Sequence, residues 1–132
     1  SRGLGDVYKR QELGNLFYSI AAADKKIRPE EREVLHNEIQ YAWKHHDRST
    51  DRFGTDRAFL IEFEFETMED EFESAENAFT SFENFFAENE KEIDQASRIK
   101  IFNSARHIAE SVRKINHEEL SYLLRLKKLL AL

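Results

Sequence analysis

The chain has 132 residues and a mass of 15.6 kDa, which is enough for one domain and too little for several. It contains no cysteine, so disulfides, thiolate metal sites and catalytic thiols are excluded. The sequence has no apolar run of about 18 residues to span a membrane. Its net charge of −6 argues against general nucleic-acid binding.

The first eleven residues differ in kind from the rest. Asp6-Val7-Tyr8-Lys9-Arg10-Gln11 is the in-frame translation of the transposon-end adapter used to build sequencing libraries. We therefore interpret residues 1–11 as an adapter-derived, non-native segment and residues 12–132 as the native domain. On this interpretation we expect the natural start of the protein to lie outside the sequence. The alternative is a native N-terminal arm.

Helical periodicity dominates from Glu12 onward. A first apolar face has the spacing of one side of a helix, with the members Leu13, Leu16, Phe17, Ile20 and Ala21. Pro29 suits the first position of a second helix, and the acids that follow it suit the positive end of the helix dipole. That helix carries Leu35, Ile39 and Ala42. We expect it to end near His45 and His46, before a loop over residues 47–57.

Residues 59–66, Phe-Leu-Ile-Glu-Phe-Glu-Phe-Glu, alternate near their end as a strand does. No partner strand is predicted elsewhere, and a lone strand leaves its backbone unsatisfied, so we predict a helix.

Three more helices are expected, with a shared pattern of apolar residues at helical spacing. Their apolar positions are Ala75, Ala78, Phe79, Phe82, Phe85 and Phe86 in the first helix, and Ile99, Phe102, Ala105, Ile108, Ala109 and Val112 in the second. The third starts near His117, with Leu120, Leu123, Leu124, Leu126, Leu129 and Leu130 inward and Ser121, Arg125 and Lys128 outward. The sequence predicts an all-α fold, a compact bundle of about six helices.

Two segments are similar at an offset of 88 residues. Residues 20–31, IAAADKKIRPEE, align with residues 108–119, IAESVRKINHEE. Each copy predicts the end of a helix, a basic turn, a buried isoleucine and a new helix with two glutamates. We therefore expect two pseudo-repeated helix-turn-helix units.

The first copy resembles the signature of the TerB-like family, which is named for a tellurite-resistance protein and is related to the N-terminal region of the DjlA co-chaperones. The family's repeat has two small residues, Asp-Gly, a hydrophobic residue, Glu-Glu and a leucine. Residues 22–35, AADKKIRPEEREVL, match it except for Lys25 in the glycine position. The resemblance covers residues 13–35 well and residues 99–130 loosely.

The resemblance implies a bacterial, cytoplasmic, all-helical domain that is not an enzyme. It implies a binding or regulatory module of a stress or tellurite response, with a divalent cation held by turn acids. Carried over to this sequence, the metal site consists of Asp24, Glu30 and Glu31. Lys25 departs from the pattern, because it places a cation beside Asp24 and makes a left-handed turn costlier. Val112 occupies the Asp24 position in the second copy.

A structural interpretation of the same glutamates stays open beside the metal site. Glu31 and Glu119 both fall at the third helical position, where a glutamate accepts from the N–H of the cap residue. Asn116 is a good N-cap for the second copy, and Arg28 is a poor one for the first.

Charge is unevenly distributed along the chain. Residues 62–94 hold thirteen acids and one base, a net charge of −12, whereas residues 95–132 carry a net charge of +5. We expect either a solvated acidic surface or one that recruits a basic protein partner or cations. The histidines lack metal-ligand spacing and the glycines form no phosphate loop, so no catalytic residue is predicted. The contrasting alternative is a carboxylate–metal enzyme, for which Glu62 and Glu66 share one helix face.

Overall fold

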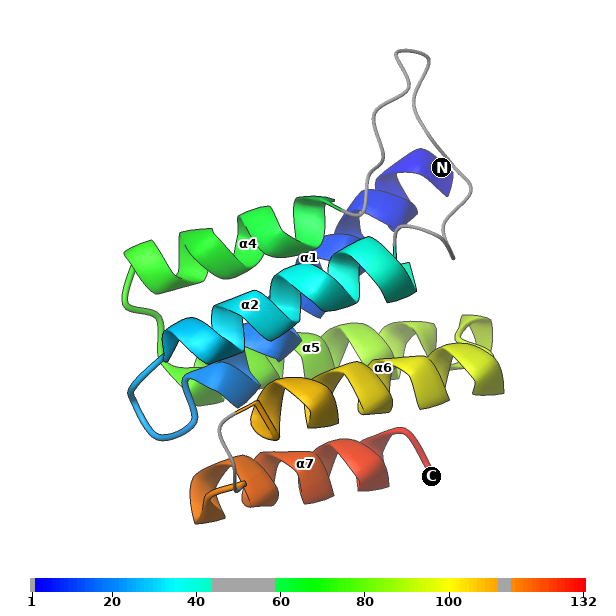
Figure 1. The fold of residues 1–132 in the computed structure, drawn as a ribbon. Helices are drawn as coiled ribbons and strands as arrows, with labels where there is room; N and C mark the ends of the chain where they lie inside the picture. The colour runs from blue at the N-terminus through cyan, green and yellow to red at the C-terminus, as the bar shows by residue number, and fades with distance from the viewer. Residues whose placement is uncertain (1, 44–58, 112–114) are drawn as a thin grey trace.

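The computed structural model describes residues 2–43, 59–111 and 115–132, with side chains from residue 9 onward. Within these parts the chain forms six α-helices and no strand (Figure 1). They are α1 (Arg2–Ala21), α2 (Pro29–Glu38), α4 (Phe59–Asp70), α5 (Ala75–Asn89), α6 (Gln95–Ala109) and α7 (His117–Leu129). A π-helical turn, η1 (Ile39–Trp43), extends α2, and a 3-10 turn, η2 (Glu90–Glu92), follows α5. The all-α prediction is confirmed, including the helix over residues 59–66.

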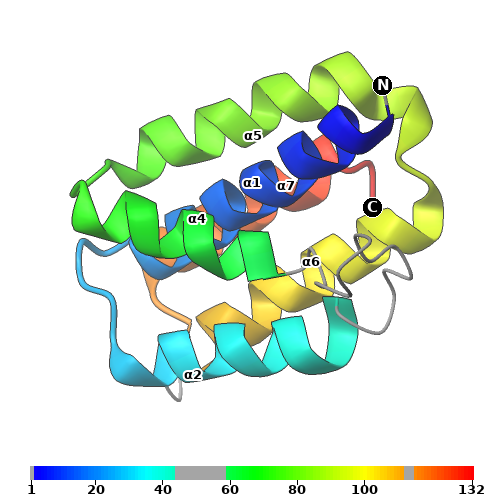
Figure 2. The same ribbon diagram turned by 90° about the horizontal axis from the view of Figure 1, so that it is seen from above.

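α1 is the central helix of the bundle. It contacts α4, α5, α6 and α7. Figure 2 shows it passing through the middle, with α5 along one side and α2 and α6 along the other. Its predicted apolar face explains this position, because all five predicted residues are buried: Leu13, Leu16, Phe17, Ile20 and Ala21. A helix with neighbours around it is the natural centre of an all-α core.

α1 begins at Arg2 and so continues through residues 2–11, the segment that we interpreted as adapter-derived. Arg10 is buried there. Extending an existing helix costs far less than nucleating one, which accounts for the continuous conformation. The origin of the segment stays a prediction.

Two of the predicted apolar faces are partly wrong. On α6, Ile99 is exposed and Ile101 is buried instead. On α7, Leu120 and Leu124 are exposed, although both were expected to face inward. α7 packs on α6 and α1 at the edge of the bundle, so its stripe of Leu123, Leu126 and Leu130 is covered while Leu120 and Leu124 are not.

Several predicted features lie outside the described residues: His45, His46, the loop over residues 47–57, and Val112. In the described parts, no helix combines the length and the hydropathy that a membrane span needs.

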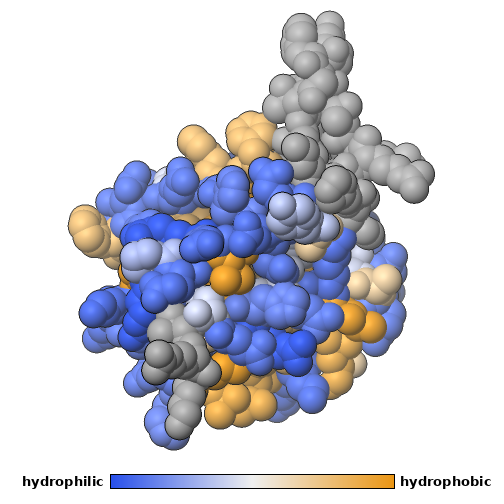
Figure 3. Space-filling view, in the orientation of Figure 1, coloured by the Kyte–Doolittle hydropathy of each residue, from blue (hydrophilic) through white to orange (hydrophobic). Residues whose placement is uncertain are grey.

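Seen from the side of Figure 1, the molecule is mostly hydrophilic (Figure 3). Hydrophobic groups gather at the upper edge, where α4 lies, and at the lower edge, where α7 lies. The exposed apolar residues of these two helices are Phe59 and Phe63 on α4 and Leu120 and Leu124 on α7.

Candidate functional site

The predicted site residue Asp24 lies in the turn between α1 and α2. Its Oδ1 atom accepts a hydrogen bond from the Lys26 N–H at 3.1 Å. Lys25 has a φ of 67°, the left-handed conformation that the family's glycine would adopt freely. A residue with a side chain is less stable than glycine in this conformation by about 1–2 kcal/mol. Lys25, in place of the glycine of the TerB-like pattern, therefore lowers the stability of this turn.

Asp24 also joins this turn to the start of α7. Its Oδ2 atom lies 3.0 Å from Arg28 Nη1 and accepts from Asn116 Nδ2 at 3.0 Å. Asn116 is the N-cap of α7, and its Oδ1 atom accepts from the Glu119 N–H at 2.8 Å. The two segments that are similar in sequence therefore meet in space at Asp24 and Asn116. The duplication that would explain their similarity stays a prediction.

Glu31 and Glu119 each complete a helix cap, as the structural interpretation predicted. Glu31 Oε1 accepts from the Arg28 N–H at 2.8 Å, and Glu119 Oε1 accepts from the Asn116 N–H at 3.1 Å. Both side chains are buried, with 0% and 3% of their residue surface exposed. Buried carboxyls need a partner or a proton, since an isolated buried charge is strongly disfavoured.

The second oxygen of Glu31 favours a proton. Glu31 Oε2 is buried and has no hydrogen-bond partner among the described residues. A proton on Glu31 would let this carboxyl donate to Glu119 instead of facing it as a second charge. Burial, reinforced by this bond and by the charge of Glu119, raises the pKa of Glu31 to about 8. Burial also raises the pKa of Glu119. Burial therefore favours a proton on Glu31 over a second charge in the pair.

Glu30, the third predicted metal ligand, is exposed, whereas Glu31 is buried. Within the described ranges, no three His, Cys, Asp or Glu side chains are arranged to hold a metal ion. The Arg28 guanidinium already supplies positive charge to Asp24. The arrangement favours capping, and the divalent cation at Asp24, Glu30 and Glu31 stays a prediction.

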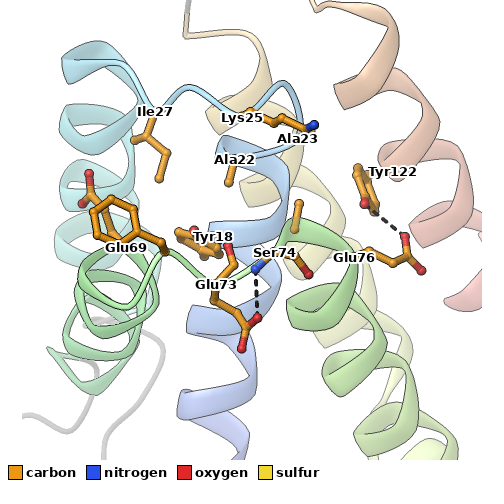
Figure 4. A pocket seen from close by; sticks show the side chains of 12 residues that line it. Tyr18, Ala22, Ala23, Lys25, Ile27, Glu69, Glu73, Ser74, Glu76 and Tyr122 are labelled. Atoms are coloured by element: carbon orange, nitrogen blue, oxygen red, sulfur yellow. Dashed lines mark hydrogen bonds between the residues drawn. The ribbon is translucent and has the colours of Figure 1, made fainter.

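A pocket of about 550 Å³ opens next to this turn, where the α1–α2 and α4–α5 turns meet (Figure 4). α1, α4, α5 and α7 also contribute to its lining. Its apolar lining includes Ala22, Ile27 and Ala75, and three acids also line it: Glu69, Glu73 and Glu76. Asp24 and Glu31 do not line it, so the turn acids and the acids of the middle helices do not converge on one cavity.

Two tyrosines fix the inner surface of the pocket. Tyr18 on α1 donates from its hydroxyl to the Glu73 carbonyl oxygen at 2.6 Å, and burial raises its pKa. Tyr122 on α7 donates to Glu76 Oε1 at 3.0 Å, as Figure 4 shows. Arg125 holds the same Glu76 carboxylate at 2.7 Å and keeps the pKa of that group below its usual value. Hydrogen bonds to the α4–α5 turn and to α5 therefore fix the two tyrosine rings.

Phe72 is the unusual residue of the pocket lining. It is 91% exposed and has a φ of 54°. It ends α4 in the manner of a Schellman motif, with its N–H bonded to the Glu69 carbonyl at 3.2 Å and the Glu73 N–H bonded to the Met68 carbonyl at 3.0 Å. This position favours glycine, and the ring gains little burial in return for the strained backbone.

The sequence analysis did not identify this pocket. Its two tyrosines were not part of any predicted stripe, and Phe72 was not singled out. The available signal was Phe72 itself, a large aromatic residue among acids and outside the helical apolar pattern. Comparison with family models, with curated proteins and with solved structures finds no match to this chain.

Proposed function

We propose that this chain is a non-catalytic binding module that takes an apolar side chain of a protein partner into the pocket beside Phe72. The observation that carries the proposal is the conformation of Phe72, which is both left-handed and 91% exposed. Strain of this kind persists where it serves a site, and large exposed aromatic residues are typical of the centre of a binding surface.

The charge around the pocket favours a basic partner segment. Glu73 lines the pocket beside the arginine-paired Glu69 and Glu76 and one base, Lys25, and the surrounding residues 62–94 carry a net charge of −12. Opposite charge on a partner speeds encounter and excludes acidic competitors. We therefore infer a partner segment with a large apolar residue flanked by lysine or arginine.

The other functional expectations have less support than this proposal. The stress-response role and the cytoplasmic location follow only from the TerB-like resemblance and stay predictions. A carboxylate–metal enzyme has less support, because the pocket acids already have partners: Glu69 pairs with Arg32, and Glu76 with Arg125.

A peptide-display selection tests the proposal and identifies the ligand. A random peptide library is selected on the full chain and counter-selected on Phe72→Asn. Asparagine tolerates the left-handed backbone, so this variant keeps the turn and removes only the ring. We expect enriched peptides to combine an aromatic or aliphatic residue with basic neighbours, and to bind Phe72→Asn about tenfold or more weakly, the loss typical of a central binding residue.

Phe63→Asn is the matched control, because Phe63 is also exposed on α4 (60%) but does not line the pocket. Peptides that bind the two variants equally well would overturn the proposal. So would a selection that enriches no peptide over the library background.

A further inference from the structure

The outward face of α4 carries two phenylalanines followed by two acids. Phe59 and Phe63 are 49% and 60% exposed, and Glu66 and Asp70, further along the helix, are also exposed. These positions recur at the spacing of one helix face, so the four side chains form a single stripe. Within the described residues, neither acid of the stripe forms an ion pair. α4 therefore presents an apolar patch with an acidic end to solvent.

The outward face of α7 has the same arrangement with the opposite charge. Leu120 and Leu124 are 44% and 59% exposed, and Lys127 and Lys128 are exposed beyond them. In the described parts of the chain, neither lysine forms an ion pair. The two leucines and Lys127 repeat the spacing of the first three members of the α4 stripe. The two helix faces therefore match in spacing and are complementary in charge.

The α4 stripe and the α7 stripe lie on opposite edges of the bundle. Figure 1 shows α4 along the upper edge and α7 along the lower edge, and Figure 3 shows hydrophobic groups at both edges. One chain therefore cannot cover its own α4 stripe with its own α7 stripe. Two copies in a line can do so, because α4 of one copy then meets α7 of the next.

We propose that this chain binds a second copy of itself head to tail, through α4 of one copy and α7 of the other. With the two helices parallel, the equal spacing places the two phenylalanines against the two leucines. The same register places Glu66 opposite Lys127. An antiparallel pairing would instead bring the acids of α4 toward the exposed Glu118, where like charges repel. Apolar burial supplies the attraction, and charge selects the register.

The proposed contact joins two different surfaces, so it does not close on a pair. Each pair of chains keeps one free α4 stripe and one free α7 stripe, and further copies can add there. Four apolar side chains and one ion pair make a small interface, of the size found in weak and transient complexes. We therefore expect a reversible association that grows with protein concentration. The two stripes do not include the pocket beside Phe72, so this inference is independent of the proposed function.

Analytical ultracentrifugation of the full chain tests the proposal. At low ionic strength, we expect the weight-average mass to rise with concentration above the monomer mass of 15.6 kDa. Phe63→Glu and Leu124→Glu each place a charge that helices accept at an exposed position, and each blocks one stripe. Either variant alone should keep the monomer mass. An equal mixture should form a pair of chains and nothing larger, because each variant supplies the stripe that the other lacks.

Ile99→Glu is the matched control, because Ile99 is exposed on α6 (45%) and lies outside both stripes. This variant should associate as the wild type does. A wild-type chain that stays monomeric up to millimolar concentration would overturn the proposal. So would a mixture of the two blocked variants that stays monomeric, or a blocked variant that associates by itself.

A charge exchange tests the parallel register. Glu66→Lys and Lys127→Glu should each weaken self-association by about twofold to fivefold, the range of one exposed ion pair. The double variant restores the pair with its signs exchanged, so it should associate as the wild type does. A double variant that associates more weakly than either single variant would contradict the register.

Discussion

At the scale of single residues, three of the residues that the structure describes have backbone conformations that glycine would adopt more readily. Lys25, Phe72 and Ala131 have φ values of 67°, 54° and 59°. Phe72 and Ala131 follow helix ends, where one left-handed residue lets the last carbonyls find donors. Each of the three therefore combines a required conformation with a side chain that disfavours it.

Replacement of Lys25 by glycine should stabilise the fold. Lys25→Gly removes the left-handed strain and should raise the free energy of unfolding by about 1 kcal/mol. Urea denaturation measures the change. Lys26→Gly is the matched control, because Lys26 is also exposed in this turn but has no left-handed backbone. An equal gain in both variants would contradict the strain argument.

At the scale of elements, the bundle depends on how closely α1 approaches α4. A Cβ atom added at Gly14 would lie 2.6 Å from the Ile61 carbonyl oxygen and 2.7 Å from Glu64 Cβ. The carbonyl belongs to the α4 backbone, so it cannot rotate away. Glycine in the middle of α1 lowers helix propensity, but it allows the two helix backbones to pack at this distance.

Gly14→Ala should therefore destabilise the protein, although alanine is the better helix former. Pushing α4 outward should lower the free energy of unfolding by about 1–3 kcal/mol, the usual cost of overpacking. Chemical denaturation followed by circular dichroism gives the value. A stabilised Gly14→Ala chain would show that α1 and α4 do not approach this closely.

The N-terminal caps of α2 and α7 also contribute to the stability of the bundle. Asn116→Ala removes the N-cap acceptor of α7 and the bond to Asp24. We expect a loss of about 1–2 kcal/mol in thermal or urea unfolding. His117→Ala changes the next, exposed residue and should alter stability by less than about 0.5 kcal/mol. Similar losses in both variants would place the effect outside the cap.

At the scale of the whole molecule, the Glu31–Glu119 pair links folding to pH. The pKa of Glu31 is about 8 in the folded chain, against an ordinary value of 4.5. Between these values the folded state holds a proton that the unfolded state has lost. The stability that this proton provides is complete below the ordinary pKa and is lost as the pH rises through the folded pKa.

Global stability should therefore fall between about pH 5 and 8, by at most about 1.4 kcal/mol per pH unit for one proton. Urea denaturation at constant ionic strength measures the slope. Glu31→Gln should have a much flatter profile and should be more stable than the wild type at pH 9. The carboxylate of Glu76, whose pKa is lowered by Arg125, acts in the opposite direction and only in acid. Identical slopes for wild type and Glu31→Gln would contradict the shared proton.

The sequence alone determined the fold class, because its information on helices is local. The apolar face of α1, Pro29 at the start of α2, and the phenylalanine stripe of α5 each follow from a 3.6-residue period or from cap chemistry. Residues 59–66 also formed the predicted helix, because an alternating segment without a partner strand satisfies its backbone only within itself.

Only the tertiary structure decided which helix faces and which charged residues are covered. Leu120 and Leu124 are as apolar as Leu123 and Leu126, but α7 lies at the edge of the bundle and has neighbours on one side only. Glu31 and Glu119 are 88 residues apart, and a local pattern shows that each caps a helix but not that the two carboxyls meet. Burial and electrostatics depend on neighbours from distant parts of the chain, and for that reason the acid pair and the pocket emerged only from the folded molecule.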